Sequence, residues 1–272
     1  MKKIALLLIV FTLALASCQL NKTNKEKEQQ LYKIETAYGD MIFKLYDATT
    51  LHKENFQKLI EQDYFDDLLF HRVIDGFMIQ GGDPESRNAK AGEMLGEGGP
   101  GYTLPAEFVD TIFHKKGVIA AAREGDDVNP EMRSSGSQFY IVQGTVFTDE
   151  DIEKVEDRIN ASRLNKMVTQ YIEEAKEQAY ATGGMIDYQV IVPEARKKAE
   201  NEFKKQGYYK IPVDKRKVYQ TIGGTPHLDN AYTVFGEVVE GLDVIDKIAA
   251  AETDKNARPI KDIKMKIVKF EE

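Results

Sequence analysis

Positions 70 to 83 read Phe70-His71-Arg72-Val73-Ile74-Asp75-Gly76-Phe77-Met78-Ile79-Gln80-Gly81-Gly82-Asp83. Most of these residues are apolar, and among them stand one guanidinium, one imidazole and one amide, on Arg72, His71 and Gln80. A guanidinium keeps its charge at every physiological pH and offers several N–H donors. The run therefore indicates a shallow apolar site with one strong hydrogen-bond donor.

The segments on either side of this run have the patterns of short strands and small helices. Residues 31–47 alternate between apolar and polar around Gly39-Asp40, which predicts a hairpin with its turn there. Residues 92–101 are rich in glycine, but no Gly-Lys-Ser/Thr follows, so an irregular loop is predicted rather than a phosphate site. Helices are expected at 49–60 and 242–250, and further strands at 117–123, 136–142, 232–236 and 260–270.

A helical block interrupts this strand-rich pattern between positions 147 and 217. Thr148 begins a capping-box-like start, and apolar residues then recur at helical intervals up to Gly183-Gly184. A second helix is predicted from Pro193 to Gly207, since proline suits a first helical turn and glycine a C-terminal cap. The many short strands favour a closed β-barrel capped by helices, because closure hides the edges of a sheet.

Composition narrows the class of protein. The 272 residues carry a formal net charge of −8, and 42% of them are hydrophobic, as in a globular chain of one or two domains. Binding nucleic acid requires clustered Lys and Arg, so no nucleic-acid partner is expected. Cys18 is the only cysteine, which leaves no disulfide within the chain and no cysteine-based metal site. His52, His114 and His227 do not stand at metal-ligand spacing with acids, so neither a metal nor a cofactor is predicted.

The first residues have the pattern of a secretory signal. Two lysines precede an apolar run over 4–16, which is too short for a permanent membrane-spanning helix. Leu15-Ala16-Ser17-Cys18 resembles the lipobox of bacterial lipoproteins, in which the peptide is cut before a cysteine that is then lipidated. We therefore expect a lipoprotein signal peptide at 1–17, lipidation at Cys18 and a flexible tether at 18–30. The protein would then be anchored to a membrane of the bacterial cell envelope, facing outside the cytoplasm (periplasm or cell surface). An ordinary signal peptide with an incidental cysteine is the alternative.

Several motifs together resemble the signature of the cyclophilins, which are peptidyl-prolyl cis-trans isomerases. They are the run at 70–83, Gly101-Tyr102-Thr103-Leu104-Pro105-Ala106-Glu107-Phe108, Gly136-Ser137-Gln138-Phe139-Tyr140-Ile141, Gly224-Thr225-Pro226-His227-Leu228-Asp229 and Val234-Phe235-Gly236. The resemblance covers residues 31–146 and 218–272, and it implies a mainly β domain: a closed, eight-stranded antiparallel barrel with two helices. The block 147–217 has no counterpart in the minimal family domain and is expected to be an α-helical insertion.

The resemblance also implies a role for each matching residue. Arg72 matches the catalytic arginine, and His71 a supporting residue beside it. The residues that match contacts to the substrate are Phe77, Met78, Gln80, Ala122, Arg123, Gln138, Tyr140, His227, Leu228 and Tyr232. Arg123 replaces a commoner Asn. Tyr140, His227 and Tyr232 stand where the eukaryotic cytosolic members have Phe, Trp and His. The hydroxyl of a buried Tyr140 would require a hydrogen-bond partner.

The implied reaction fits these residue types. Rotation about an X-Pro bond breaks amide resonance and crosses a barrier of about 18–20 kcal/mol. No covalent bond is made or broken, so no nucleophile, acid or metal is required. An apolar slot for the proline ring and a donor that favours the twisted amide are sufficient, and a guanidinium is such a donor. The sequence thus predicts a prolyl isomerase that acts on proline-containing polypeptides and assists folding outside the cytoplasm.

Other functions fit parts of the pattern. A cyclophilin-like scaffold could bind proline-containing segments without turnover, although the complete set of Arg72, Phe77 and Gln138 favours the enzyme. A jelly-roll-like carbohydrate binder is disfavoured, because the chain contains no Trp. Two interpretations stay open for the block 147–217: a decoration that packs on the barrel, or an arm that binds a client or a protein partner beside the site.

Overall fold

The computed structural model describes residues 29–271. The chain divides into two compact units, Met1–Gln30 and Leu31–Glu272. The signal peptide predicted at 1–17, the lipidation site at Cys18 and nearly all of the tether predicted at 18–30 lie outside the described residues. Within the described range, no helix combines the length and the apolar character needed to cross a membrane.

One large antiparallel sheet forms the centre of the second unit. Its strands are β1 (Leu31–Thr36), β2 (Gly39–Leu45), β3 (Arg72–Ile74), β4 (Met78–Gly81), β6 (Val118–Ala121), β8 (Phe139–Val142), β9 (Val234–Glu240) and β10 (Met265–Lys269). In space they follow the order β10-β1-β2-β9-β6-β8-β4-β3. The short strands β5 (Thr103–Leu104) and β7 (Ser134–Ser135) pair with each other outside this sheet. The predicted mainly β architecture with eight antiparallel strands is confirmed.

The predicted closure of the barrel is not confirmed, because the edge strands β10 and β3 do not pair in the ladder. The sheet is curled but open. The segments that precede these strands do meet, since Leu69 and Lys264 form an isolated bridge and the N–H of Phe70 donates to the carbonyl of Ile263 at 2.9 Å. With 3 residues, β3 offers too few main-chain groups for a continuous ladder to β10.

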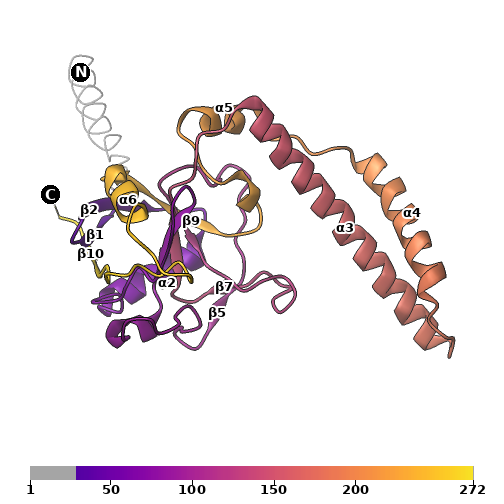
Figure 1. The fold of residues 1–272 in the computed structure, drawn as a ribbon, viewed down its shortest axis with the longest axis horizontal. Coiled ribbons are helices and arrows are strands. Elements are labelled where there is room, and N and C mark those ends of the chain that lie inside the picture. Colours follow the sequence, from indigo (N-terminus) through magenta and orange to yellow (C-terminus); the bar gives the residue numbers. More distant parts are fainter. Residues whose placement is uncertain (1–28, 272) are drawn as a thin grey trace, which may run out of the picture. The chain divides into compact units, whose positions relative to one another are not determined.

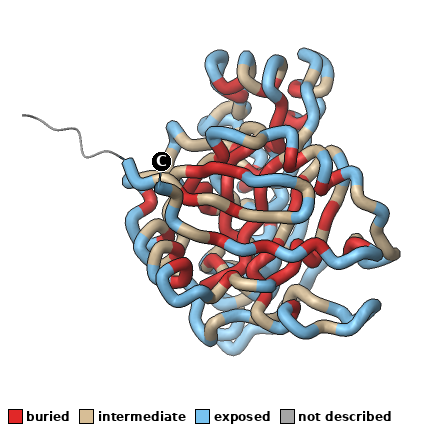
Figure 2. Tube along the Cα trace, turned by 90° about the vertical axis from the view of Figure 1, so that its left-hand side faces the viewer, coloured by how far each residue is buried: buried red, intermediate tan, exposed pale blue. Residues whose placement is uncertain are grey.

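Two helices cover the sheet, as the sequence predicts. α2 (Thr50–Glu61) buries Phe56, Leu59 and Ile60, and α6 (Leu242–Ala249) buries four residues of its own. These side chains join the inner-face residues of the strands in one hydrophobic core. Figure 2 shows the buried residues running along the strands, while the outer turns are exposed. The first hairpin also forms as predicted, but its turn lies at 37–38, because Gly39 and Asp40 already belong to β2.

The insertion contains three helices. α3 (Asp149–Ala181) begins with a complete capping box between Thr148 and Asp151. α4 (Tyr188–Gln206) packs beside α3, and α5 (Val213–Thr221) follows it (Figure 1). The predicted start of the second helix at Pro193 is wrong: Asp187 caps the helix by accepting from the N–H of Gln189 at 2.9 Å, and Pro193 lies inside it. The sequence patterns did not predict α5, and the expected boundary at 217 falls within it.

The insertion has two parts that differ in burial. We define residues 147–163 and 206–221 as the base, and residues 164–205 as the distal arm. In the base, Ile152, Val155, Ile211 and Tyr219 form a hydrophobic cluster. In the distal arm, which the structure describes in full, the buried residues are Val168, Ala195 and Ala199. The base is therefore built like the rest of the domain, whereas the distal arm is mostly solvated.

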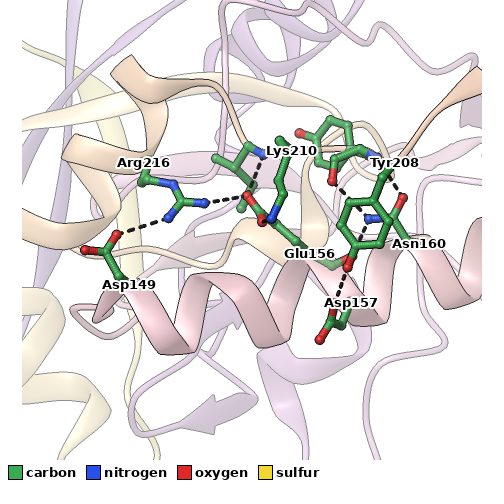
Figure 3. Close-up of polar contacts among 9 residues, drawn as sticks. Asp149, Glu156, Asp157, Asn160, Tyr208, Lys210 and Arg216 are labelled. Atoms are coloured by element: carbon green, nitrogen blue, oxygen red, sulfur yellow. Dashed lines mark hydrogen bonds and ion pairs between the residues drawn. The ribbon is translucent and has the colours of Figure 1, made fainter.

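A buried carboxylate fixes the base (Figure 3). Glu156 accepts hydrogen bonds from the N–H of Ile211 at 2.9 Å, from Arg216 at 2.8 Å and from Lys210 at 2.7 Å. Arg216 also donates to Asp149 at 3.0 Å. Burial alone would raise the pKa of Glu156, but the hydrogen bonds from these donors outweigh it and lower the pKa. Glu156 thus ties the start of α3 to the chain that enters α5.

Candidate active site

The strands β3, β4 and β8 place alternate side chains on the two faces of the sheet. Arg72 lies opposite Gln80 across β3 and β4, and Gln80 lies opposite Tyr140 across β4 and β8. Because paired residues point to the same face, these three form one row. The residues between them, such as Val73 and Ile79, point into the core. Because side chains alternate between the two faces along each strand, the apolar residues point into the core and Arg72 points to the outer face.

This row borders a cavity of about 180 Å³. The residues that line it are Arg72, Phe77, Met78, Gln80, Ala122, Arg123, Tyr140, Leu228 and Tyr232. All of them belong to the set that the resemblance implied, and the fold brings them together from distant segments. Of the other implied contacts, His227 stacks on Phe77 with ring centroids 5.7 Å apart, and Gln138 lines an adjoining groove.

A relay of amides orients the Arg72 guanidinium. Its Nη1 donates to Oε1 of Gln80 at 3.1 Å, and the Nε2 of Gln80 donates to Oε1 of Gln138 at 3.1 Å. Nε2 of Gln138 donates in turn to the carbonyls of Gly96 and Gly98, at 2.7 and 2.8 Å. Each amide has its oxygen facing a donor and its nitrogen facing an acceptor, so neither can flip without losing hydrogen bonds. The relay therefore fixes Arg72 at the cavity.

The glycine-rich loop ends this relay. The Asp83 carboxylate is fully buried and accepts from the N–H of Gly96 at 2.5 Å and from the N–H of Glu85 at 2.8 Å. A Cβ at Gly98 would lie 2.1 Å from Oδ1 of Asp83, so only glycine fits there. The irregular loop is confirmed, and its glycines allow the main chain to approach a buried carboxylate. The same loop lines the adjoining groove of about 760 Å³.

Arg123 and Tyr232 form one wall of the cavity. The Arg123 guanidinium lies over the Tyr232 ring, 4.6 Å from its centroid. The main chain of Ala122 is already occupied, because its N–H donates to Gln138 and its carbonyl accepts from Ser135. Among the described residues, the N–H and carbonyl of Arg123 have no main-chain partner. Of the two neighbours, Arg123 is therefore the one with main-chain groups available to an extended peptide.

The hydroxyl of Tyr140 has the partner that its burial requires. It lies 2.9 Å from Nε2 of His114, whose Nδ1 lies 3.0 Å from the Asp229 carboxylate. The sequence did not predict the pair of His114 and Asp229, since these two residues are far apart in the chain and at no recognised spacing. His52 likewise lies 2.6 Å from Glu107. No group of three or more potential metal ligands occurs among residues 29–271.

His71 lies in the core behind Arg72. It is 3% exposed, and neither ring nitrogen has a hydrogen bond of normal geometry to a described residue. Burial lowers the pKa of His71 to about 4, against the opposing attraction of Asp83. The ring is thus neutral at physiological pH, and the supporting role that the resemblance implies for His71 stays a prediction.

Comparisons with known proteins agree with this geometry. The family described as "Cyclophilin type peptidyl-prolyl cis-trans isomerase/CLD" matches residues 31–169 and 214–270, which is more than half of the chain. The chain belongs to this family, the cyclophilin-type peptidyl-prolyl cis-trans isomerases.

The relatives differ in how much of their length this chain spans. A relative from Staphylococcus haemolyticus, whose name assigns it to the peptidyl-prolyl cis-trans isomerases, is 29% identical over 93% of this chain and 97% of its own. A Streptococcus pyogenes relative, whose name combines a phosphatase with such an isomerase, is 29% identical, and the chain spans 36% of its length. A solved cyclophilin-type isomerase of Cryptosporidium parvum shares the fold, with a TM-score of 0.53 and 20% identity over 90% of this chain and 99% of that one.

Proposed function

We propose that the cavity isomerises X-Pro bonds in polypeptides, with Arg72 as the catalytic residue. The placement of Arg72 carries this proposal: its guanidinium is held by Gln80 at 3.1 Å beside a cavity whose apolar walls include Phe77 and Leu228. Nη1 of Arg72 also lies 3.9 Å from the sulfur of Met78, so the cation borders the slot directly. The proline ring enters the slot, and the amide that rotates lies against the guanidinium.

The guanidinium favours the twisted amide over both planar isomers. In the planar state the proline nitrogen shares its lone pair with the carbonyl, and as the bond twists that lone pair becomes an acceptor. An Arg72 N–H that donates to this nitrogen, or holds the neighbouring carbonyl, binds most strongly in the twisted state, which lowers the barrier. Raising a rate of one event in tens of seconds to about 10³ per second requires roughly 7 kcal/mol. Because the amide relay orients Arg72 in advance, little of this gain is lost to reorganisation.

The rest of the substrate lies along the groove. Gln80, Ala122 and Arg123 border both the cavity and the larger groove, so a chain bound at the cavity continues there. An extended peptide pairs its main chain with the free N–H and carbonyl of Arg123. The substrates in this proposal are unfolded or extended segments of proteins that contain proline, since only such segments can enter an open groove.

Activity of the wild-type protein and of Arg72→Ala tests the proposal. The assay follows cis-to-trans conversion of an Ala-Ala-Pro-Phe peptide. We expect kcat/KM to fall by about 10² to 10³ in Arg72→Ala, as when one preorganised donor is removed from other enzymes. Arg72→Lys keeps the charge but loses the planar fork and should lie between the two. Arg196→Ala, on the exposed side of α4, is the matched control and should be unchanged.

A wild-type protein with no rate above background would contradict the proposal. If such a protein still bound the peptide, the non-catalytic scaffold would be the better description. Peptide affinity measured beside the rate therefore separates the two functions, because the scaffold requires only the slot while the enzyme also requires the guanidinium.

The proposal places this activity outside the cytoplasm, in the folding of proline-containing proteins. Its support is the sequence of the first residues, with a lipobox-like stretch that ends at Cys18. The protein is then held at a membrane of the bacterial envelope by a lipid on that residue. Labelling with a radioactive fatty acid, followed by membrane fractionation, tests this for the wild type and Cys18→Ser. Label and membrane association should both be lost in Cys18→Ser, and an unlabelled, soluble wild type would contradict the anchor.

A further inference from the structure

A buried chain of hydrogen bonds connects the cavity to the base of the insertion. Tyr140, which lines the cavity, has its hydroxyl 2.9 Å from Nε2 of His114. Nδ1 of His114 lies 3.0 Å from Oδ1 of Asp229, and the hydroxyl of Tyr219 donates to Oδ2 of Asp229 at 2.7 Å. The side chains of His114 and Asp229 are 1% and 5% exposed, and Tyr219 is 0% exposed, so water does not compete along the chain.

With Asp229 as a carboxylate and His114 as a neutral imidazole, the direction of each hydrogen bond follows. A carboxylate only accepts, so Oδ2 of Asp229 takes the hydroxyl proton of Tyr219 and Oδ1 takes the Nδ1 proton of His114. With its proton on Nδ1, the neutral imidazole offers Nε2 as an acceptor, and the hydroxyl of Tyr140 donates to it. Burial raises the pKa of both tyrosine hydroxyls, so both remain donors. The hydroxyl proton of Tyr140 therefore points to His114 and not into the cavity.

The far end of this chain is held by the base of the insertion. Tyr219 lies on α5, and its ring packs edge-on against Phe113 and Phe147, with centroids 5.5 and 6.3 Å apart. The same cluster includes Ile152 and Val155 from the first turns of α3. The position of the Tyr219 hydroxyl consequently depends on how α3 and α5 pack.

We propose that His114, Asp229 and Tyr219 are positioning residues for the isomerase site, which hold the Tyr140 hydroxyl out of the proline slot and so keep the slot apolar. The proposal rests on the proposed function for its biological meaning, but it concerns the affinity of the slot for proline. It makes the base of the insertion a part of the site. None of the three residues touches the substrate, since each acts through Tyr140.

The dissociation constant of the Ala-Ala-Pro-Phe peptide, measured by NMR titration of the full chain, tests the proposal. Tyr140→Phe keeps the ring and removes the hydroxyl, so its dissociation constant is the reference for a slot without that hydroxyl. His114→Leu leaves that hydroxyl without its acceptor, and we expect about tenfold weaker binding because the hydroxyl turns into the slot to reach water. Adding Tyr140→Phe to His114→Leu should restore affinity to within about threefold of Tyr140→Phe alone.

The rescue separates positioning from a general structural role. A merely structural His114 would leave the double variant as weak as His114→Leu, and that result would overturn the proposal. Thermal unfolding of each variant verifies that the titrated protein is folded. If His114→Leu does not fold, Tyr219→Phe tests the other end of the chain with almost no change in volume. It should weaken binding about threefold in the wild type and have no effect in Tyr140→Phe, whereas equal effects in both backgrounds would overturn the proposal.

The outcome is distinguishable from that of the proposed function. A wild type that binds the peptide without accelerating its isomerisation would contradict the enzyme, yet the affinities of the variants would still support or overturn the role of His114. A wild type that does not bind the peptide would overturn both proposals.

Discussion

The pocket and the base of the insertion both bury an ionisable side chain, but they do so in opposite ways. His71, behind the pocket, is buried without a hydrogen bond of normal geometry to a described residue, and its pKa is lowered to about 4. Glu156, in the base, is buried as an anion with three donors, and its pKa is lowered despite burial. One region avoids the cost of a buried charge by neutrality and the other by pairing. The two regions should therefore respond differently to mutation and to acid.

Removing the Glu156 carboxylate should have the largest effect. Glu156→Ala leaves the buried N–H of Ile211 without its acceptor and separates Arg216 and Lys210 from their shared partner. Lys210 and Arg216 can regain water, since their side chains are 60% and 22% exposed, so the cost comes mainly from the unsatisfied N–H and the lost hydrogen bonds and is about 2–3 kcal/mol. Urea unfolding followed by circular dichroism should show this loss in the free energy of unfolding.

Glu153→Ala is the matched control for this comparison. Glu153 lies on the same helix, one turn earlier, and is exposed. Its replacement should change the free energy of unfolding by less than about 0.5 kcal/mol. If the two variants lost equal stability, pairing at Glu156 would not be what holds the base.

Acid should act on His71 before it acts on Glu156. The pKa of His71 falls from 6.5 to about 4 on folding, so the unfolded chain binds a proton first as the pH is lowered. Stability from this residue is present above pH 6.5 and is lost as the pH falls toward 4, by up to about 3 kcal/mol. The pKa of Glu156 is instead lowered from 4.5, so its contribution is lost only below that value.

Urea unfolding at pH 7 and pH 4, for the wild type and His71→Gln, measures the first of these losses. Gln cannot titrate, so the variant should lose less stability than the wild type between the two values. Parallel losses in both proteins would show that His71 is not buried in its neutral form. Only the difference between the proteins counts, because burial also lowers the pKa values of His52 and His227.

The apolar wall of the slot should contribute less than either buried group. Leu228 is 9% exposed and faces the cavity. Leu228→Ala removes contacts with the proline ring and should lower kcat/KM for the peptide by about tenfold, equivalent to roughly 1.4 kcal/mol. Val213→Ala, at a position that is 83% exposed, should leave kcat/KM unchanged. A Leu228→Ala enzyme with wild-type kcat/KM would remove Leu228 from the slot.

Patterns in the sequence predicted many residues of the pocket but not the buried hydrogen bonds of His114 and Asp229 behind it. The apolar run at 70–83 with its single guanidinium indicated the site, and the resemblance to the family motifs implied Gln80 and the distant walls. His114 and Asp229 were missed because they are 115 positions apart, and a pair joined only by the fold leaves no spacing to detect. The Tyr140 hydroxyl was the one available signal, since a buried hydroxyl implies a partner without naming it.

The errors in the fold have similar causes. Closure of a barrel depends on the register of edge strands, and alternation within each strand does not contain that information. α5 was missed because it has 9 residues and buries only Lys215 and Tyr219, which form no apolar stripe. At α4 the predicted start was Pro193, because proline suits a first helical turn, but the helix begins earlier, where the side chain of Asp187 caps it.

Shortening the distal arm should have the smallest effect on the pocket, and it sharpens the contrast between base and arm. Replacing 164–205 with a short Gly-Asn linker joins Arg163 to Gln206 and keeps the base, because hairpins of two helices close with about 2–5 residues. Arg163 would still donate to Asn160 at 3.0 Å, and Glu156 and Tyr219 would keep their partners. We expect kcat/KM for the peptide to stay within about twofold of the wild type.

Refolding of a protein limited by X-Pro isomerisation, catalysed by the wild type and by the shortened variant, then decides between the two interpretations of the distal arm. Loss of catalysis only with the protein substrate would make the arm a binding element for clients, and unchanged catalysis with both substrates would make it a decoration. A tenfold loss with the peptide alone would mean that the distal arm, like the base, belongs to the site.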